Sequence, residues 1–231
     1  MAGSAFYYLA LEPILRRLWP QTLISWSRLL AGTIRDPLVG RTIMVGVLAG
    51  VATSLLRHLG ATVEGQLLAT TDWNRLVSSG GGISIILDQS QRALFYGFGT
   101  GIVIVLFVAL LRSRRLAAAV ATLVIALIVL RPTGFLLTAF TVAATSVMVV
   151  VLIRHGVLAL VVAIWVFFIL EHLPVTIEVD QWYAGAGILA VVAILILALY
   201  GFAISTPTRG MLGGLLMEDR HAHPSPSDTI K

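Results

Sequence analysis

The chain has 231 residues, of which 58% are hydrophobic and only 12% charged, and its formal net charge is +5. A soluble domain carries about 25% charged residues, and a chain this small cannot hide so many apolar side chains from water. The composition therefore excludes an ordinary soluble protein, and the absence of cysteine excludes disulfides, thiolate metal sites and a cysteine nucleophile.

The first segment of the chain, residues 1–41, is predicted to lie at the membrane surface. Residues 5–15 are apolar but too short to cross a bilayer, and they contain a proline. Residues 18–30 alternate large apolar residues with polar ones, which favours an amphipathic helix in the headgroup plane. Trp19 and Trp26 would then be interfacial anchors of this helix.

Six apolar ranges follow, each close to the length that a helix needs to cross the hydrocarbon core, about 30 Å thick. The third range is short for a span, and an Arg-Pro turn at residues 131 and 132 predicts that it pairs with the fourth as a hairpin. The ranges are 42–56, 93–111, 116–130, 134–153, 157–170 and 183–204. The sequence thus predicts an all-α, polytopic integral membrane protein with about six transmembrane helices in residues 42–205, preceded by the interfacial helix.

Two segments are predicted to stay outside the bundle. Residues 60–91 form the longest outer connection, and the apolar run 83–87 beside three glycines predicts a loop that dips back toward the lipid, with Trp73 at the interface. The tail, residues 206–231, ends in a Pro- and Ser-rich stretch, and we expect it to be unfolded unless a partner holds it.

The distribution of Lys and Arg predicts the orientation, because cytoplasmic flanks of membrane helices carry the excess. With the amino terminus inside, twelve of these residues fall on inner flanks and four on outer flanks. Both termini are therefore expected in the cytoplasm. Trp182 and Tyr183 would anchor the outer turn before the last span. The outer four are Arg57, Arg75, Arg92 and Arg131.

Ionisable side chains are all expected at helix ends or in loops, which argues against a proton relay or an ion pathway. His58, His155 and His172 would sit at helix termini, so interfacial polarity is favoured over ligation of a haem or chlorophyll metal. The acidic outer turn, residues 171–183, can receive a cation or a basic partner, but a solvated loop is the simpler interpretation. We expect no catalytic residue, cofactor or metal.

Small residues four apart are the strongest remaining pattern, because helices in lipid associate through close backbone approach. These residues either join the six helices to one another, which is the favoured interpretation, or dock onto a helix of another protein. The predicted packing residues are Gly46, Gly50, Ser54, Gly97, Gly101, Ala139, Ala143, Ala186 and Ala190.

Several stretches resemble a known type of membrane region. Residues 11–20, 23–30 and the motif Arg35-Asp-Pro-Leu-Val-Gly-Arg41 look like the opening of the multispanning region at the carboxy-terminal end of some bacterial serine/threonine protein kinases. Residues 156–163, 182–187 and 199–202 are similar to its closing helices. The kinase Gly-rich loop and its catalytic His-Arg-Asp and Asp-Phe-Gly motifs are missing, so the resemblance implies a membrane module without kinase residues.

The sequence therefore predicts a non-catalytic scaffold or accessory subunit that packs against other transmembrane helices in a larger inner-membrane complex, for example a bioenergetic or photosynthetic assembly. Two alternatives remain open: a small-solute transporter or channel, and a sensor or anchor module for a separate kinase. The expected partners are membrane lipids and other integral membrane subunits. Nucleic acid is not expected, because the arginines are spread along the chain rather than gathered on one face.

Overall fold

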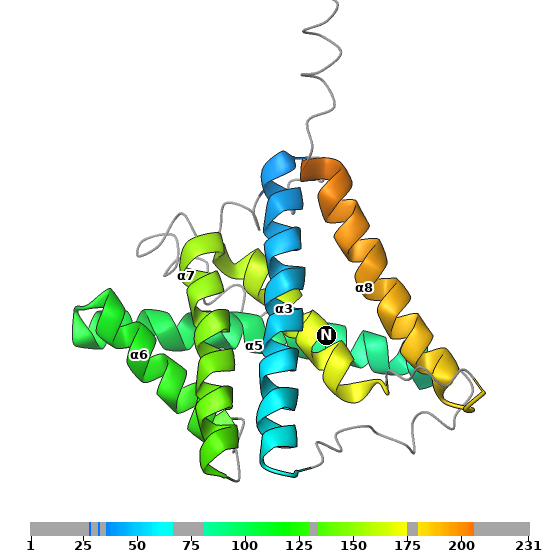
Figure 1. Cartoon of the computed structure of the whole chain (residues 1–231). Helices are drawn as coiled ribbons and strands as arrows, with labels where there is room; N and C mark the ends of the chain where they lie inside the picture. Colours follow the sequence, from blue (N-terminus) through cyan, green and yellow to red (C-terminus); the bar gives the residue numbers. More distant parts are fainter. Residues whose placement is uncertain are drawn as a thin grey trace, which may run out of the picture.

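The computed structural model describes residues 36–66, 81–129, 134–174 and 180–205, together with Arg28 and Gly32. All regular secondary structure within these residues is helical (Figure 1). The predicted interfacial helix, the tail, Trp19, Trp26 and Trp73 lie outside the described residues.

Four of the described helices are long and apolar enough to cross a membrane, which indicates an integral membrane protein. They are α3 (Pro37–Val63), α5 (Gly81–Leu111), α7 (Phe135–His172) and α8 (Ala184–Ser205). The predicted range 116–130 forms a shorter helix, α6 (Arg114–Val124), which continues into a π-helical turn, η2 (Ile125–Val129). The ranges 134–153 and 157–170 both lie in α7. The described residues therefore do not divide into six separate helices of spanning length.

Helix α7 is bent at Gly156, whose backbone angles are φ 86° and ψ −176°. This region of backbone space is essentially restricted to glycine, because a Cβ atom would clash there. The halves of α7, residues 135–155 and 157–172, consequently run in different directions, with the bend toward the end of the molecule where α3 begins (Figure 1). We refer to them as the first and second halves of α7.

Helix α3 packs against both α7 and α8, and close backbone approach makes both contacts possible. A Cβ atom added at Gly50 would lie 2.6 Å from the Ala163 carbonyl oxygen in the second half of α7. One added at Gly40 would lie 2.7 Å from the Gly201 carbonyl oxygen in α8. The absence of side chains at these glycines therefore sets the helix spacing.

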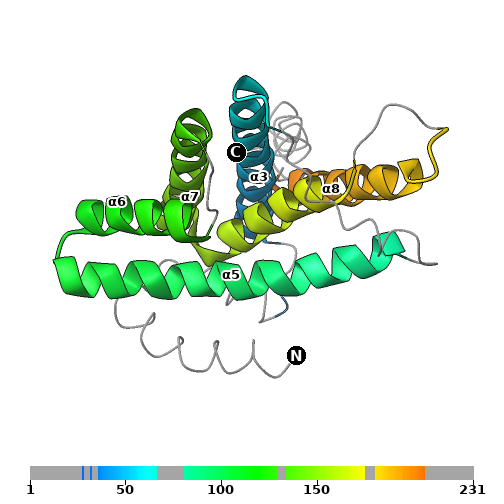
Figure 2. The same ribbon diagram turned by 90° about the horizontal axis from the view of Figure 1, so that it is seen from below.

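Helix α5 runs across α3 and the first half of α7 rather than alongside them (Figures 1 and 2). Its buried residues join those of α7 in one apolar core cluster, which includes Phe98, Ile104 and Leu160. A second cluster joins α3, α8 and the second half of α7 through residues such as Ile43, Val166 and Ile194. Helix α7 has more buried residues than α3, α5 or α8, so it forms the centre of the described structure.

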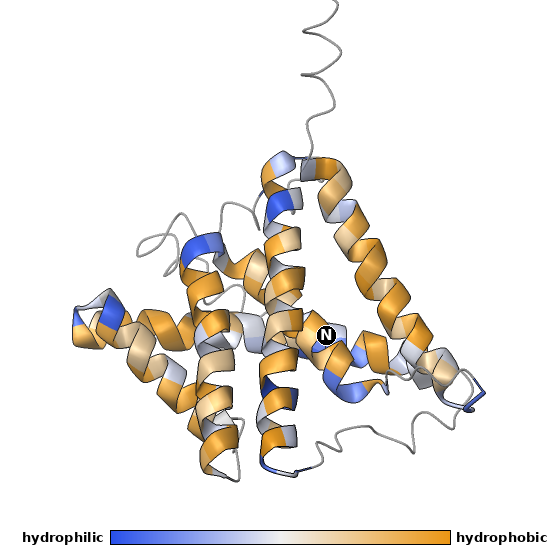
Figure 3. Cartoon of the chain, viewed as in Figure 1, coloured by the Kyte–Doolittle hydropathy of each residue, from blue (hydrophilic) through white to orange (hydrophobic). Residues whose placement is uncertain are grey.

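Apolar side chains cover the outside of the described helices as well as the core. Large side chains such as Leu110, Phe135 and Leu199 are mostly exposed. Hydrophilic residues gather at the turn between α5 and α6, at the bend of α7 and at the start of α8, with a further patch within α3 (Figure 3). Contiguous exposed apolar surface of this kind is expected where lipid is the solvent.

Two carboxylates satisfy amides at helix starts. Asp36 is the N-cap of α3, where one carboxylate oxygen accepts from the Leu38 amide at 2.9 Å, and its other oxygen pairs with Arg28. Glu64, the residue after α3, accepts from the Leu137 amide in the first turn of α7 at 2.9 Å. Glu64 therefore joins the end of α3 to the start of α7.

The predicted helix boundaries differ most from the observed ones at two places. Helix α5 begins at Gly81 rather than Ala93, so the predicted outer loop is helical over residues 81–91. Helix α3 continues to Val63 rather than ending near Leu56. Both errors have one cause, since a window of apolar residues stops at the first charged side chain, whereas a helix continues wherever that side chain finds a partner.

Candidate functional site

A buried ion pair lies where α3 and α7 approach their carboxy-terminal ends. Arg57 lies six residues before the end of α3, and Glu171 is the second-last residue of α7. Their side chains are 13% and 2% exposed, and Arg57 Nη1 lies 3.6 Å from Glu171 Oε2. His58 Nδ1 lies 3.6 Å from the other carboxylate oxygen of Glu171.

The burial of this pair corrects two sequence predictions. Arg57 lies within a helix rather than at its end, and Glu171 is buried rather than part of a solvated turn. The Arg57 guanidinium also lies 5.6 Å from the centre of the Phe167 ring, so an aromatic face and a carboxylate both stabilise its charge. Charges removed from solvent need such partners, because desolvation otherwise exceeds their attraction.

A second charged pair lies within α5, where the sequence predicted a loop. Arg92 Nε lies 3.1 Å from Asp88 Oδ2, one helical turn earlier. Between them, the Ser90 hydroxyl accepts a hydrogen bond of 2.8 Å from the indole N–H of Trp165 in the second half of α7. Trp165 therefore packs against a neighbouring helix.

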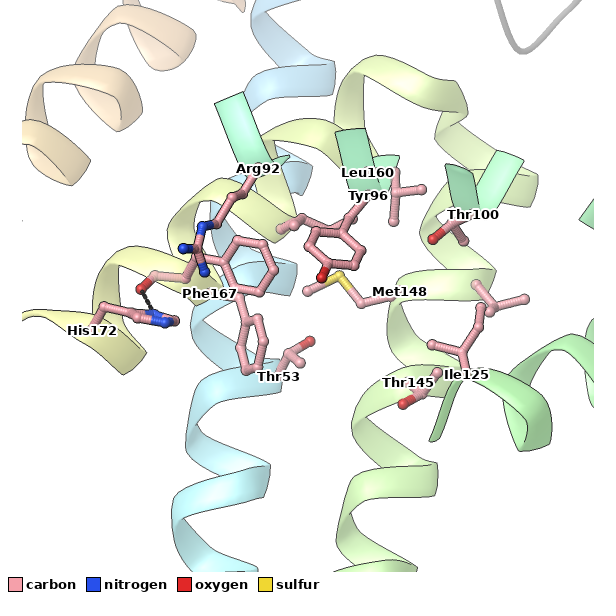
Figure 4. Close-up of a pocket in the computed structure, with 13 residues that line it drawn as sticks. Thr53, Arg92, Tyr96, Thr100, Ile125, Thr145, Met148, Leu160, Phe167 and His172 are labelled. Carbon is pink, nitrogen blue, oxygen red and sulfur yellow. Dashed lines mark hydrogen bonds between the residues drawn. The ribbon is translucent and has the colours of Figure 1, made fainter. Parts of the chain in front are cut away.

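A cavity of about 260 Å³ lies where α3, α5, η2 and both halves of α7 meet. We call it the central cavity. Figure 4 shows Arg92 and His172 at one side, Thr100 and Ile125 at the other, and Tyr96 between them. The remaining lining residues include Met148, Leu160, Ile164 and Phe167. The central cavity therefore has one basic side and an apolar interior.

A larger cavity of about 610 Å³ lies between α3, the end of α7 and α8. We call it the lateral cavity. Its polar lining comes from Ser54, His58 and Glu171, and most of its remaining wall is aliphatic. His58 Nδ1 is 2.9 Å from the Ser54 carbonyl oxygen, so the imidazole is held against its own helix. The buried ion pair thus borders this cavity through its carboxylate.

The predicted packing residues of α3 and α5 have different surroundings. A Cβ atom at Gly46 would lie 2.8 Å from the Ala159 carbonyl oxygen, and one at Gly97 would lie 2.5 Å from Val161 Cγ2, so both glycines face the second half of α7. Ser54 is buried beside His58. Nothing lies within 4 Å of a Cβ atom at Gly101.

The predicted packing residues of α7 and α8 also differ from one another. Ala139 and Ala143 are exposed on the first half of α7, whereas Ala190 of α8 is buried and Ala186 is half-buried. Trp182 and Tyr183 precede α8 and make an edge-to-face contact at 5.6 Å between ring centres, with Trp182 62% exposed. Among the described residues, Ala139 and Ala143 are therefore the predicted packing pair whose two members are both exposed.

Sequence reasoning missed three contributors to these contacts. Gly40 and Gly201 form the crossing of α3 and α8, and Glu64 caps α7. Gly201 and Ser205 do have the fourfold small-residue spacing that identified the other stripes. Glu64 carries no such signal, because its amide partner is 73 residues away in the chain.

The described helices define the class of this protein as an all-helical membrane protein. No protein family, curated protein or solved structure matches the chain. Its function therefore has to be inferred from its own residues. Within the described part of the chain, no three His, Cys, Asp or Glu residues are grouped so that they could hold a metal ion.

Proposed function

We propose that this protein is a non-catalytic scaffold or accessory subunit of a bacterial inner-membrane complex, in which it packs against transmembrane helices of other proteins. The observation that carries the proposal is the exposed pair Ala139 and Ala143 on the first half of α7. They are four residues apart, so their methyl groups lie on one face of the helix.

The physical basis is the way in which helices associate in lipid. Lipid tails are as apolar as Leu side chains, so helices gain little from burying apolar surface and associate instead where small residues let backbones approach. Gly46, Gly50 and Gly97 already serve this purpose between helices of this chain. The pair Ala139 and Ala143 has the same spacing and faces outward, so it offers a helix of another subunit the same close approach.

The proposed topology has six passes and both termini in the cytoplasm. The passes are α3, α5, α6 with η2, the two halves of α7, and α8. The excess of Lys and Arg on the inner flanks supports this arrangement, and so does the bend at Gly156, which divides α7 at the predicted boundary between two passes. The resemblance to the membrane region of some bacterial protein kinases would fit a subunit that anchors a separate kinase or transmits a signal to it.

The test uses leucine substitutions that enlarge the exposed pair. In mild detergent, the wild-type protein should co-purify with a stoichiometric membrane partner. Ala139→Leu with Ala143→Leu should abolish co-purification while leaving the thermal midpoint of the isolated protein nearly unchanged, because both side chains are exposed. Ala119→Leu, on the exposed face of α6, is the matched control and should retain the partner.

Two results would contradict the scaffold proposal. One is a wild-type protein that elutes as a homogeneous monomer, and the other is retention of the partner by the double variant. Gly46→Leu is unsuitable for this test, since Gly46 contacts the chain's own α7 and its replacement disrupts the fold as well as any assembly.

A second candidate function is the binding or transport of a small solute. The burial of Arg57 and Glu171 beside the lateral cavity favours it, because ionisable residues within membrane helices are costly and usually serve a function. Flux into proteoliposomes that Glu171→Gln abolishes would support this function over the scaffold. Absence of flux for a panel of small ions and metabolites would contradict transport and would indicate that the pair of Arg57 and Glu171 has a structural role.

A further inference from the structure

The volume of the central cavity suits a ligand with a single aliphatic chain. At about 260 Å³ it exceeds the roughly 150 Å³ cavity that holds a benzene molecule, and it is just below the usual 300–1,000 Å³ range of ligand pockets. A lipid with two acyl chains is too large for this volume. The fit is to one aliphatic chain of medium length.

The charge of the central cavity is positive on one side only. Among the described residues that line the cavity, Arg92 alone has a permanent charge and none is acidic. Asp88 holds the Arg92 guanidinium from the preceding helical turn but is not part of the cavity wall. Tyr96 adds a phenolic hydroxyl near the middle (Figure 4). A ligand with an anionic head would therefore find its donors at Arg92.

Two threonine hydroxyls in the rest of the wall need no hydrogen bond from a ligand. The hydroxyls of Thr53 and Thr145 donate to the carbonyl oxygens of Ala49 and Thr141 in their own helices, each at 2.8 Å. Their hydrogens are thus already used, and an aliphatic chain beside them leaves no donor unsatisfied. Met148 and Leu160 contribute flexible and branched apolar surface to the same wall.

We propose that the central cavity binds a single-chain aliphatic carboxylate, with its carboxylate at Arg92 and its chain running past Tyr96 toward Ile125. This binding site is independent of the scaffold function, because Ala139 and Ala143 do not line the cavity. The bilayer is the immediate source of such molecules, since free fatty acids partition into it.

Equilibrium dialysis of delipidated protein held in an amphipathic polymer tests the proposal, with radiolabelled decanoate and 1-decanol as probes. The full chain should bind one decanoate saturably and 1-decanol more weakly. Arg92→Gln should weaken decanoate binding about tenfold or more and leave 1-decanol unchanged, because only the carboxylate loses a charged donor. Arg154→Gln is the matched control, since Arg154 is an exposed residue outside the cavity wall.

Two further variants separate binding from misfolding. Asp88→Asn releases Arg92 from its ion pair, so decanoate should bind severalfold more tightly. A misfolded protein cannot give this result. Thr100→Leu adds volume at the end of the cavity away from Arg92 and should weaken decanoate more than hexanoate.

The proposal is overturned by equal affinity for decanoate and 1-decanol, by no effect of Arg92→Gln, or by no saturable binding of either probe. A second arm of the experiment adds phosphatidylglycerol, an anionic lipid with two chains. If phosphatidylglycerol displaces decanoate and Arg92→Gln abolishes its binding, the site takes a bilayer lipid and the single-chain assignment is wrong.

Discussion

Helices α7 and α8 are both strongly apolar, yet α7 is mostly buried within the molecule and α8 is mostly exposed. In the most apolar stretch of α7, 72% of the residues are buried inside the protein, whereas the corresponding figure for α8 is 22%. In water, such a difference would appear as a polar face on the more exposed helix. In lipid it need not, because a membrane-facing side chain and a core side chain are both apolar.

Small residues on the contacting helix, rather than hydropathy, distinguish the two positions. The second half of α7 lies against Gly46 and Gly50 of α3, where its backbone carbonyls approach closely. Helix α8 reaches α3 mainly at the crossing of Gly40 and Gly201. Between these two helices, the difference in burial therefore follows the glycines of α3, whereas hydropathy is high in both.

The largest expected effect comes from filling the contact between α3 and α7. Gly50→Leu places a side chain where even a Cβ atom lies 2.6 Å from a backbone oxygen, so we expect loss of about 3 kcal/mol of folding free energy or complete loss of folded protein. Gly99→Leu, where nothing lies within 4 Å, should be tolerated. Thermal unfolding followed by size-exclusion chromatography checks both variants, and similar midpoints would refute the packing role of Gly50.

A direct comparison of α7 with α8 uses matched truncations. Leu160 in α7 is fully buried, whereas Leu199 in α8 is 65% exposed. Leu160→Ala should lower the free energy of unfolding by about 3 kcal/mol, because it removes core contacts and leaves a cavity, and Leu199→Ala by less than about 0.5 kcal/mol. Reversible unfolding in mixed micelles measures both. Equal losses would mean that α8 is as tightly packed as α7 in solution.

The smallest expected effect is a dependence on pH at the start of α3. The Leu38 amide and Arg28 hold the pKa of the Asp36 carboxyl below its usual value of 3.8. Since the pKa is lowered in the folded state, the stabilisation is present above the unfolded pKa and disappears as the pH falls through the folded pKa. Acid should therefore loosen the start of α3, which lies beside α8.

Asp36→Asn isolates this effect, because asparagine still caps a helix but carries no charge for Arg28. The thermal midpoint of the wild-type protein should exceed that of the variant near pH 6, and the two should converge as the pH falls through the lowered folded pKa of Asp36, since both caps are then neutral. A constant difference across this range would show that the charge of Asp36 contributes nothing.

Much of the helical content was predictable, because lipid requires every backbone group to be paired within the helix. Ranges 42–56, 93–111 and 183–204 fall within or almost within α3, α5 and α8. The break between residues 153 and 157 coincides with the bend at Gly156. The starting point of α5 was not predictable from hydropathy, because Asp88 and Arg92 interrupt the apolar run and satisfy each other only once the helix exists.

The candidate site was less accessible to sequence reasoning. Arg57 and Glu171 are 114 positions apart, and nothing local indicates that one charge will neutralise the other. The central cavity depends on where α5 crosses α3 and α7, which apolar periodicity does not determine. The spacing of Gly46 and Gly50 did indicate a packing face, but only the structure identifies the second half of α7 as its neighbour.

The bend at Gly156 has a consequence for how α7 fits a bilayer. As one straight helix, its 38 residues would measure about 57 Å, nearly twice the thickness of the hydrocarbon core, about 30 Å. The bend at a residue without a side chain turns the second half back, so that Leu137 near the start of α7 and Glu171 near its end both contact the region where α3 ends, at Glu64 and Arg57. In the proposed six-pass topology, the direction in which α8 crosses the membrane would thus depend on the φ and ψ angles of one residue, Gly156.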